Sequence, residues 1–169
     1  MVTTVSRVLA LDLGRRRVGV AVSDPLGQTA QPLTVLDAGD DQRLAGEVAH
    51  LCRQYEVDTL VVGLPLNMDG TAGPEAQRAR RLAQRLREQL GLPVVEWDER
   101  LSTAAAERML VAADLSRARR RRVRDKVAAA VILQSYLDSR ARRVTRDGAP
   151  AEDAPAAGGS AAGGSAGDA

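Results

Sequence analysis

Aromatic residues are almost absent from the sequence: phenylalanine does not occur, and aromatic residues make up only 2% of the chain. Proteins that bind single strands by stacking bases on aromatic side chains need several of them, so the composition argues against that class. The one cysteine, Cys52, excludes an internal disulfide and a cysteine-based zinc site. No apolar run approaches the roughly 20 residues of a membrane span, and no apolar leader is visible. We therefore expect a cytoplasmic protein without membrane association.

Arginine is abundant, and it dominates the charge of the chain. All 24 basic residues precede Asp147, whereas four of the 22 acidic residues lie at or beyond it, so residues 1–146 carry a net charge of +6. Guanidinium groups suit phosphate oxygens, and a basic surface is what nucleic-acid binding requires. The alternative interpretation is that an arginine-rich, alanine-rich chain reflects genomic base composition. Composition alone therefore favours a nucleic-acid partner without establishing it.

The pattern of apolar residues predicts an α/β domain. Expected strands are residues 8–13, 18–23, 33–36, 59–63 and 94–97, and expected helices are residues 41–55, 74–90, about 102–113 and 125–140. Residues 116–124 are read as an arginine-dense connector. The order of elements predicts a mixed five-stranded sheet, three antiparallel strands followed by two parallel ones, flanked by helices. The alanine-, glycine- and serine-rich residues 147–169 are expected to form a disordered tail after a folded domain at residues 1–146.

Carboxylates stand at the ends of several expected elements. Asp12 closes the first apolar run, Asp98 and Glu99 follow the fifth strand, and Asp125 begins the last helix. Each acid taken singly also has a structural explanation. Asp12 can accept hydrogen bonds from the backbone amides of the turn, and the negative charge of Asp125 is favoured by the dipole at the start of a helix. If the strands are adjacent, however, the acids emerge at one edge of the sheet, where α/β proteins bind ligands. Converging hard oxygen ligands select Mg²⁺ or Mn²⁺, and a pair of such ions serves phosphodiester cleavage.

Four blocks of sequence resemble the YqgF (RuvX) family. They are Asp12-x-Gly14 with the VGVA run at 18–21, VGLPLNMDG at 62–70, DERLST at 98–103 and DKVAAAVILQ at 125–134. Together they span roughly residues 7–140. The resemblance implies the ribonuclease-H-like fold of Holliday-junction resolvases and the activity of a pre-16S ribosomal RNA nuclease. It also implies that Asp12, Glu99 and Asp125 bind the metal ions, with Asp98 as rival or supporting partner of Glu99.

The chain departs from the resolvase pattern at its fourth strand. In resolvase relatives the second carboxylate closes that strand, whereas here the strand runs into Gly63 and the acid comes one strand later. The geometry of the metal site is therefore expected to differ. In the following loop, Asn67 and Asp69 are candidates for contact with substrate, and a role in the turn itself is the alternative.

The sequence thus predicts a metal-dependent nuclease acting on structured nucleic acid, with 5′-end processing of the 16S rRNA precursor as the leading assignment. Residues expected to contact phosphates or substrate are Arg15, Arg16, Arg17, Asn67, Arg100, Arg119, Arg120, Arg121, Arg122 and Arg124. The alternatives are a dimeric resolvase that cuts branched DNA, a non-catalytic module for nucleic-acid binding or ribosome assembly, and, as a third reading, a small-molecule phosphotransferase. The sequence leaves a monomer and a homodimer both open.

Overall fold

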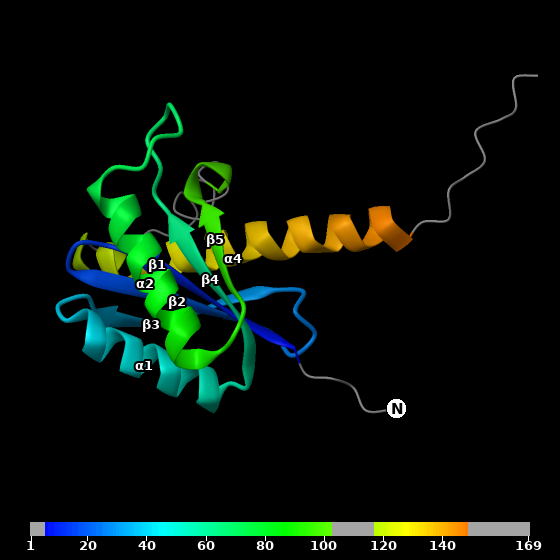
Figure 1. Ribbon diagram of the computed structural model, residues 1–169, viewed down its shortest axis with the longest axis horizontal. Helices are drawn as coiled ribbons and strands as arrows, with labels where there is room; N and C mark the ends of the chain where they lie inside the picture. Colours follow the sequence, from blue (N-terminus) through cyan, green and yellow to red (C-terminus); the bar gives the residue numbers. More distant parts are fainter. Residues whose placement is uncertain (1–5, 103–116, 149–169) are drawn as a thin grey trace, which may run out of the picture.

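Five strands form one mixed sheet in the part of the chain that is described, residues 6–102 and 117–148 of a computed structural model (Figure 1). The strands are β1 (Arg7–Leu13), β2 (Arg17–Ser23), β3 (Ala30–Asp37), β4 (Val57–Leu64) and β5 (Val94–Asp98). Their spatial order is β3-β2-β1-β4-β5. The first three are antiparallel, β4 pairs in parallel with β1, and β5 pairs in parallel with β4. The predicted mixed sheet is confirmed.

The β1–β2 hairpin turns at a position where only glycine fits. The amide of Gly14 donates a hydrogen bond to the carbonyl oxygen of Arg17 over 2.8 Å. A Cβ atom at Gly14 would lie 2.6 Å from that same oxygen, which is closer than real Cβ atoms come. The turn therefore needs glycine, and it fixes the register that brings Asp12 opposite Gly19.

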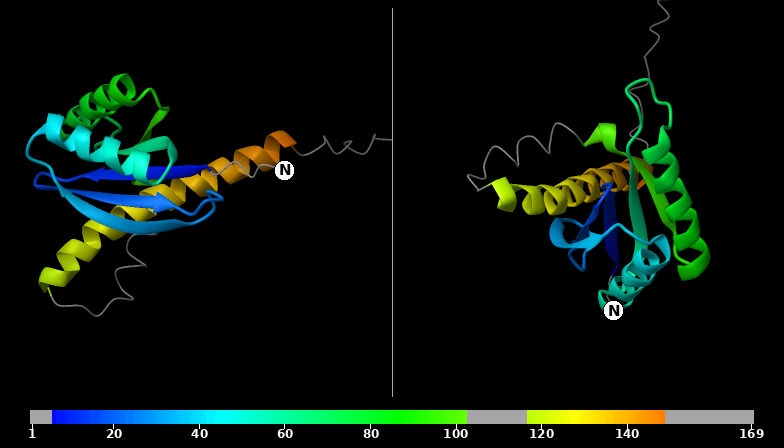
Figure 2. Two further views of the ribbon diagram at one scale, coloured as in Figure 1. Left: turned by 90° about the horizontal axis from the view of Figure 1, so that it is seen from below. Right: turned by 90° about the vertical axis from the view of Figure 1, so that its left-hand side faces the viewer.

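Helices cover the sheet on both faces (Figure 2). Helices α1 (Asp41–Gln54) and α2 (Pro74–Leu90) lie on one face, and the long helix α4 (Arg117–Gly148) crosses the other. As the sequence predicts, Asp40 caps α1 by accepting a hydrogen bond from the Gln42 amide, and Gly91 ends α2 in the left-handed conformation. None of the described helices has the length and apolar character needed to cross a membrane.

Alternation along the central strands assigns their side chains to two cores. Leu9 and Leu11 of β1 pack into the core beneath α1 and α2, whereas Val8 and Ala10 face α4. Since successive side chains of a strand point to opposite faces, the next residue on the α4 side is Asp12. The same alternation in β4 places Val61 with the α4 core, followed on that face by Gly63.

Helix α4 differs from the prediction at both ends. The expected connector at residues 116–124 is helical from Arg117 onward, and the helix continues to Gly148, two residues into the predicted tail. Arginine is a good helix former, and the run holds no glycine or proline, so its charge density gave the wrong indication. A short 3₁₀ turn, η1 (Glu99–Leu101), was not anticipated. The helix predicted from about residue 102 to 113 and the tail from residue 149 lie outside the described residues.

The packing of α4 can be tested on one buried and one exposed side chain. Leu133 is fully buried between α4 and the sheet, whereas Val144 of the same helix is 68% exposed. We expect Leu133→Ala to lower the free energy of unfolding by about 2–5 kcal/mol, because it removes buried methyl groups and leaves a cavity. Val144→Ala should change it by less than about 0.5 kcal/mol. Urea denaturation of the two variants makes the comparison, and equal effects would contradict this packing.

Candidate active site

Asp12 stands near the end of β1 on the face covered by α4. It pairs across the hairpin with Gly19 of β2, which presents no side chain beside it. The parallel pairing of β1 with β4 reaches Leu11 and Val62, so Asp12 lies just beyond the last pair of this ladder, at the carboxyl ends of both strands. The fold therefore places this carboxylate at the edge where α/β sheets bind ligands, as the sequence predicts.

Glu99 reaches Asp12 from the other side of β4. It follows β5 in the turn η1. The side chain of Asp98 caps this turn by accepting a hydrogen bond from the Arg100 amide over 3.0 Å. A Cβ atom built on Gly63 would lie 2.7 Å from Glu99 Oε1 and 3.2 Å from Glu99 Cγ. The Glu99 side chain thus occupies the space that a side chain at the end of β4 would fill.

The two carboxyl groups share a hydrogen bond, and one of them keeps its proton. Burial raises the pKa of Glu99 to about 9, and the negative charge of Asp12 and the hydrogen bond to Asp12 add to the effect. The direction follows from physics: a second negative charge in a poorly solvated place, beside a first, is unfavourable. At neutral pH the Asp12–Glu99 pair therefore favours holding one proton.

Asp98 is engaged differently from Glu99. Its carboxylate accepts hydrogen bonds from Arg100 Nε over 3.0 Å and from Arg100 Nη2 over 2.7 Å. This forked pair lowers the pKa of Asp98, chiefly through the side-chain hydrogen bond. In this arrangement Asp98 orients Arg100, whereas Glu99 faces Asp12.

Arg100 also joins η1 to the loop between β4 and α2. Its Nη1 atom lies 3.4 Å from the carbonyl oxygen of Asn67 and 3.3 Å from that of Met68. The loop is closed on itself as well: the Asn67 side-chain amide donates to Thr71 Oγ1, and Asp69 accepts from both the amide and the hydroxyl of Thr71. The side chains of Asn67 and Asp69 thus hold the turn, the alternative that the sequence left open.

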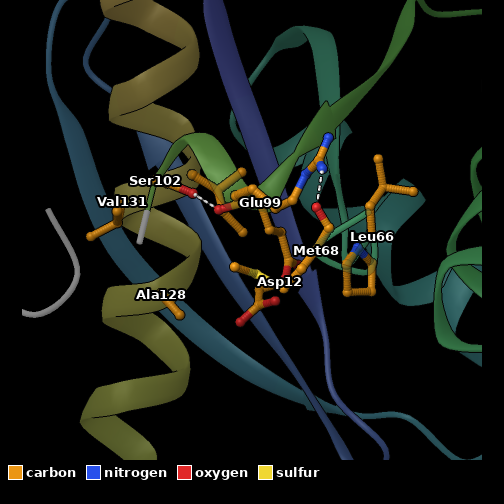
Figure 3. A pocket seen from close by; sticks show the side chains of 10 residues that line it. Asp12, Leu66, Met68, Glu99, Ser102, Ala128 and Val131 are labelled. Atoms are coloured by element: carbon orange, nitrogen blue, oxygen red, sulfur yellow. Dashed lines mark hydrogen bonds between the residues drawn. The ribbon is translucent and has the colours of Figure 1, made fainter. Parts of the chain in front are cut away.

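A cavity of about 350 Å³ lies beside the acids (Figure 3). The carboxylates of Asp12 and Glu99 line one part of it, between the loop after β4 and helix α4. The rest of its wall is formed by Pro65, Leu66, Met68, Arg100, Ser102, Ala128, Val131 and Ile132. Sequence reasoning missed Gly63, Met68 and Val131 as parts of the site. Period-2 alternation from Val61 was a signal for Gly63, and Met68 belongs to the VGLPLNMDG block at 62–70 that carries the family resemblance.

The other predicted site residues are distributed around this centre. Arg15 forms an exposed ion pair with Glu75 over 3.0 Å, Arg16 is exposed in the hairpin turn, and Arg17 begins β2. The backbones of Asp125 and of the arginines at 119–122 and 124 belong to α4, and their side chains lie outside the described residues. Among the side chains that are described, no three potential metal ligands form a cluster, and Asp12 and Glu99 are the two predicted acids brought together.

The shared proton predicts how stability varies with pH. Folded Glu99 keeps its proton up to about pH 9, whereas in the unfolded chain its pKa returns to 4.5. Between these values the folded state binds more protons, so its stability falls as pH rises. We expect Glu99→Gln to remove this slope, and to raise Tm over the wild type by an amount that grows between about pH 5 and pH 9 without added metal.

Thermal denaturation at several pH values measures this effect. Glu88→Gln is the matched control, because Glu88 is exposed on α2 and away from the cavity. Its profile should run parallel to that of the wild type. A Glu99→Gln profile parallel to the wild type would show that Glu99 holds no extra proton.

Comparison with known proteins agrees with the fold and the family resemblance. A family model described as RuvX, Holliday junction resolvase, matches residues 6–139. A protein of Geobacillus thermodenitrificans is 57% identical over 136 residues, 79% of this chain and 99% of its own length. One of Bacillus cytotoxicus is 53% identical with the same coverage. Both bear the name "Putative pre-16S rRNA nuclease".

Solved structures place the fold. RuvC of T. thermophilus, in complex with a Holliday junction substrate, superposes with a TM-score of 0.57 at 16% identity, covering 81% of this chain and 96% of RuvC. The yeast mitochondrial Holliday junction resolvase Ydc2 gives 0.51 at 13% identity, covering 82% of this chain and 80% of Ydc2. At such identities the likeness establishes the fold, which is ribonuclease-H-like. The match over residues 6–139 and the identities above 50% establish the relationship: this chain belongs to the RuvX family.

Proposed function

We propose that this protein is a metal-dependent nuclease that hydrolyses phosphodiester bonds in structured nucleic acid. The observation that carries the proposal is the Asp12–Glu99 pair at the carboxyl edge of the sheet, beside an open cavity. The leading substrate is the 5′ end of the 16S rRNA precursor, because the relatives that share more than half of the aligned residues are named for that activity. The nuclease domain would extend to the end of α4 at Gly148, two residues beyond the boundary expected at 146, with a disordered tail after it.

The donor chemistry of the site fits divalent cations. Carboxylate oxygens are the ligands that Mg²⁺ and Mn²⁺ prefer, and the proton shared by Asp12 and Glu99 marks a place where positive charge is favourable. We propose Asp12, Glu99 and Asp125 as the ligands of two ions, with Asp98 as the alternative to Glu99. Asp125 is included because of its backbone position, one helical turn before Ala128 and Ala129 of α4. Bound ions would activate water and stabilise the leaving oxygen.

The basic residues singled out in the sequence are proposed to hold the phosphates, and Arg100 is the one among them that lines the cavity in the described part of the chain. The candidates are Arg15, Arg16, Arg17, Arg100, Arg119, Arg120, Arg121, Arg122 and Arg124. The ion pair of Arg15 with Glu75 is exposed, so a phosphate can replace the carboxylate at little cost. Arg100 is held in place by Asp98, and part of its surface stays accessible to solvent.

A dimeric Holliday junction resolvase is the second candidate function. The observation in its favour is the superposition on resolvases, one of them solved with junction DNA. A resolvase must cut two strands symmetrically and therefore act as a dimer. A third, non-catalytic candidate, a module that binds nucleic acid or assists ribosome assembly, would need the fold but not the acids.

Replacing Asp12 tests the proposed chemistry. We expect Asp12→Asn to lower cleavage by more than the roughly 10–100-fold that is typical of substitutions outside the inner ligand shell of a metal. Binding of RNA should persist or tighten, because one negative charge is removed near the phosphates. Cleavage of a labelled precursor-16S leader and of a four-way DNA junction is measured in the presence of Mg²⁺, Mn²⁺ or a chelator. Paired symmetric nicks in the junction would favour the resolvase, and binding without metal-dependent cleavage would favour the non-catalytic module.

Gly63 provides a second test, in which no acidic residue is replaced. We expect Gly63→Ala to fold, because the three atoms nearest to its Cβ position belong to the Glu99 and Ile132 side chains rather than to the backbone. Glu99 would be pushed away from Asp12, and cleavage should fall by about 10–100-fold. Gly39→Ala is the matched control, since nothing lies within 4 Å of its Cβ position. Full activity of Gly63→Ala at wild-type Tm would contradict the role given to Glu99.

A further inference from the structure

The cavity beside the acids has two chemically different parts. Asp12 and Glu99 contribute carboxyl groups to it, and the Arg100 guanidinium group adds a cation. The remaining wall is mostly aliphatic, with Leu66 and Met68 contributed by the loop after β4 and Val131 by α4 (Figure 3). Its volume of about 350 Å³ falls within the range of small-molecule sites, roughly 300–1,000 Å³. Neither the acids nor the proposed metal ions account for the apolar part.

One wall of this apolar part is fixed in place by its backbone. The side chain of Met68 is 94% exposed, so its own burial does not hold it. The carbonyl oxygens of Asn67 and Met68 instead face Arg100 Nη1, and Asp98 fixes the Arg100 guanidinium group from its other side. The amide of Asn67 also donates to the Thr71 carbonyl oxygen over 2.9 Å. The backbone that carries Met68 is thus anchored at the rim of the cavity, and the Met68 side chain remains open to a ligand.

We propose that the apolar part of this cavity receives one unpaired nucleobase of the substrate, from a nucleotide next to the phosphate that is cleaved. This inference rests on the proposed nuclease function. A nucleotide joins an anionic phosphate to a flat, largely apolar base, and the cavity joins a cation-binding acid pair to aliphatic walls in the same way. The thioether of Met68 is polarisable and makes favourable contacts with aromatic rings.

The proposal narrows the class of substrate. A base inside a continuous duplex is stacked and paired, and it reaches such a cavity only at the cost of leaving the stack. Nucleic acid with an unpaired nucleotide at the cut, such as a single-stranded flank or a branch point, avoids this cost. Aliphatic walls contact the faces of a base rather than its hydrogen-bonding edges, so the identity of the base should matter little.

Removing single bases from the substrate tests the inference. An abasic nucleotide is placed in turn at each position around the cut of a cleaved oligonucleotide. At one position adjoining the cut we expect kcat/KM to fall by about tenfold, near the lower end of the effect of a base held by side-chain contact. Met68→Ala should lower kcat/KM on the intact substrate by a similar factor, and it should cause little further loss on the abasic one. No abasic position with an effect, or additive losses in Met68→Ala, would overturn the proposal.

A matched control and a binding readout separate this inference from the proposed function. Leu26→Ala is the control, because Leu26 is 64% exposed in the β2–β3 turn, which follows the end of β2 remote from Asp12. It should match the wild type on every substrate. Fluorescence of 2-aminopurine at the same positions reports base capture without cleavage. A position-specific change lost in Met68→Ala would support the subsite even in a protein that does not cut, whereas metal-dependent cutting with no such change would overturn the subsite alone.

Discussion

The close approach of two carboxyl groups is the constraint on which the rest of the site depends. Asp12 and Glu99 are partly removed from water and share a proton, because two adjacent negative charges in such a place would repel each other. The arrangement lowers the free energy of unfolding at neutral and higher pH, and this destabilisation arises at the edge of the sheet. Stored repulsion of this kind is relieved by a cation, which gives the acid pair its proposed purpose.

Small residues make this approach possible. Gly63 leaves open the space above β4 that the Glu99 side chain fills, and Gly19 leaves Asp12 without a bulky neighbour across the hairpin. On the same face, Ala10 and Ala21 of the sheet meet Ala129 and Ala130 of α4 in one buried cluster. Side chains this short let the helix lie close to the sheet. The cavity then forms where α4 passes the strand ends, between its aliphatic residues and the loop held by Arg100.

The departure from the resolvase pattern therefore has a spatial solution. On the resolvase pattern, a second acid is expected at the end of the fourth strand, where this chain has Gly63. Glu99 comes from the turn after β5 and reaches the space in front of Gly63, since Gly63 pairs with Trp97 two residues before it. An acid from a neighbouring strand thus occupies the place that a side chain on β4 would hold. Asp98, its neighbour in sequence, points to Arg100 and supports the loop instead.

The sequence by itself determined the strands, the caps and the candidate acids. Apolar alternation and the glycines at the turns are local signals, so the hairpin, the cap at Asp40 and the end of α2 at Gly91 followed from neighbouring residues. The resemblance of four blocks pointed to the family and to Asp12 and Glu99. One local signal was misread: the arginines from 117 onward are good helix formers, and they extend the helix that residues such as Leu133 pack against the sheet. Only the tertiary structure decided that Glu99 rather than Asp98 faces Asp12, and that Met68 stands at the cavity, because both depend on contacts between elements far apart in the chain.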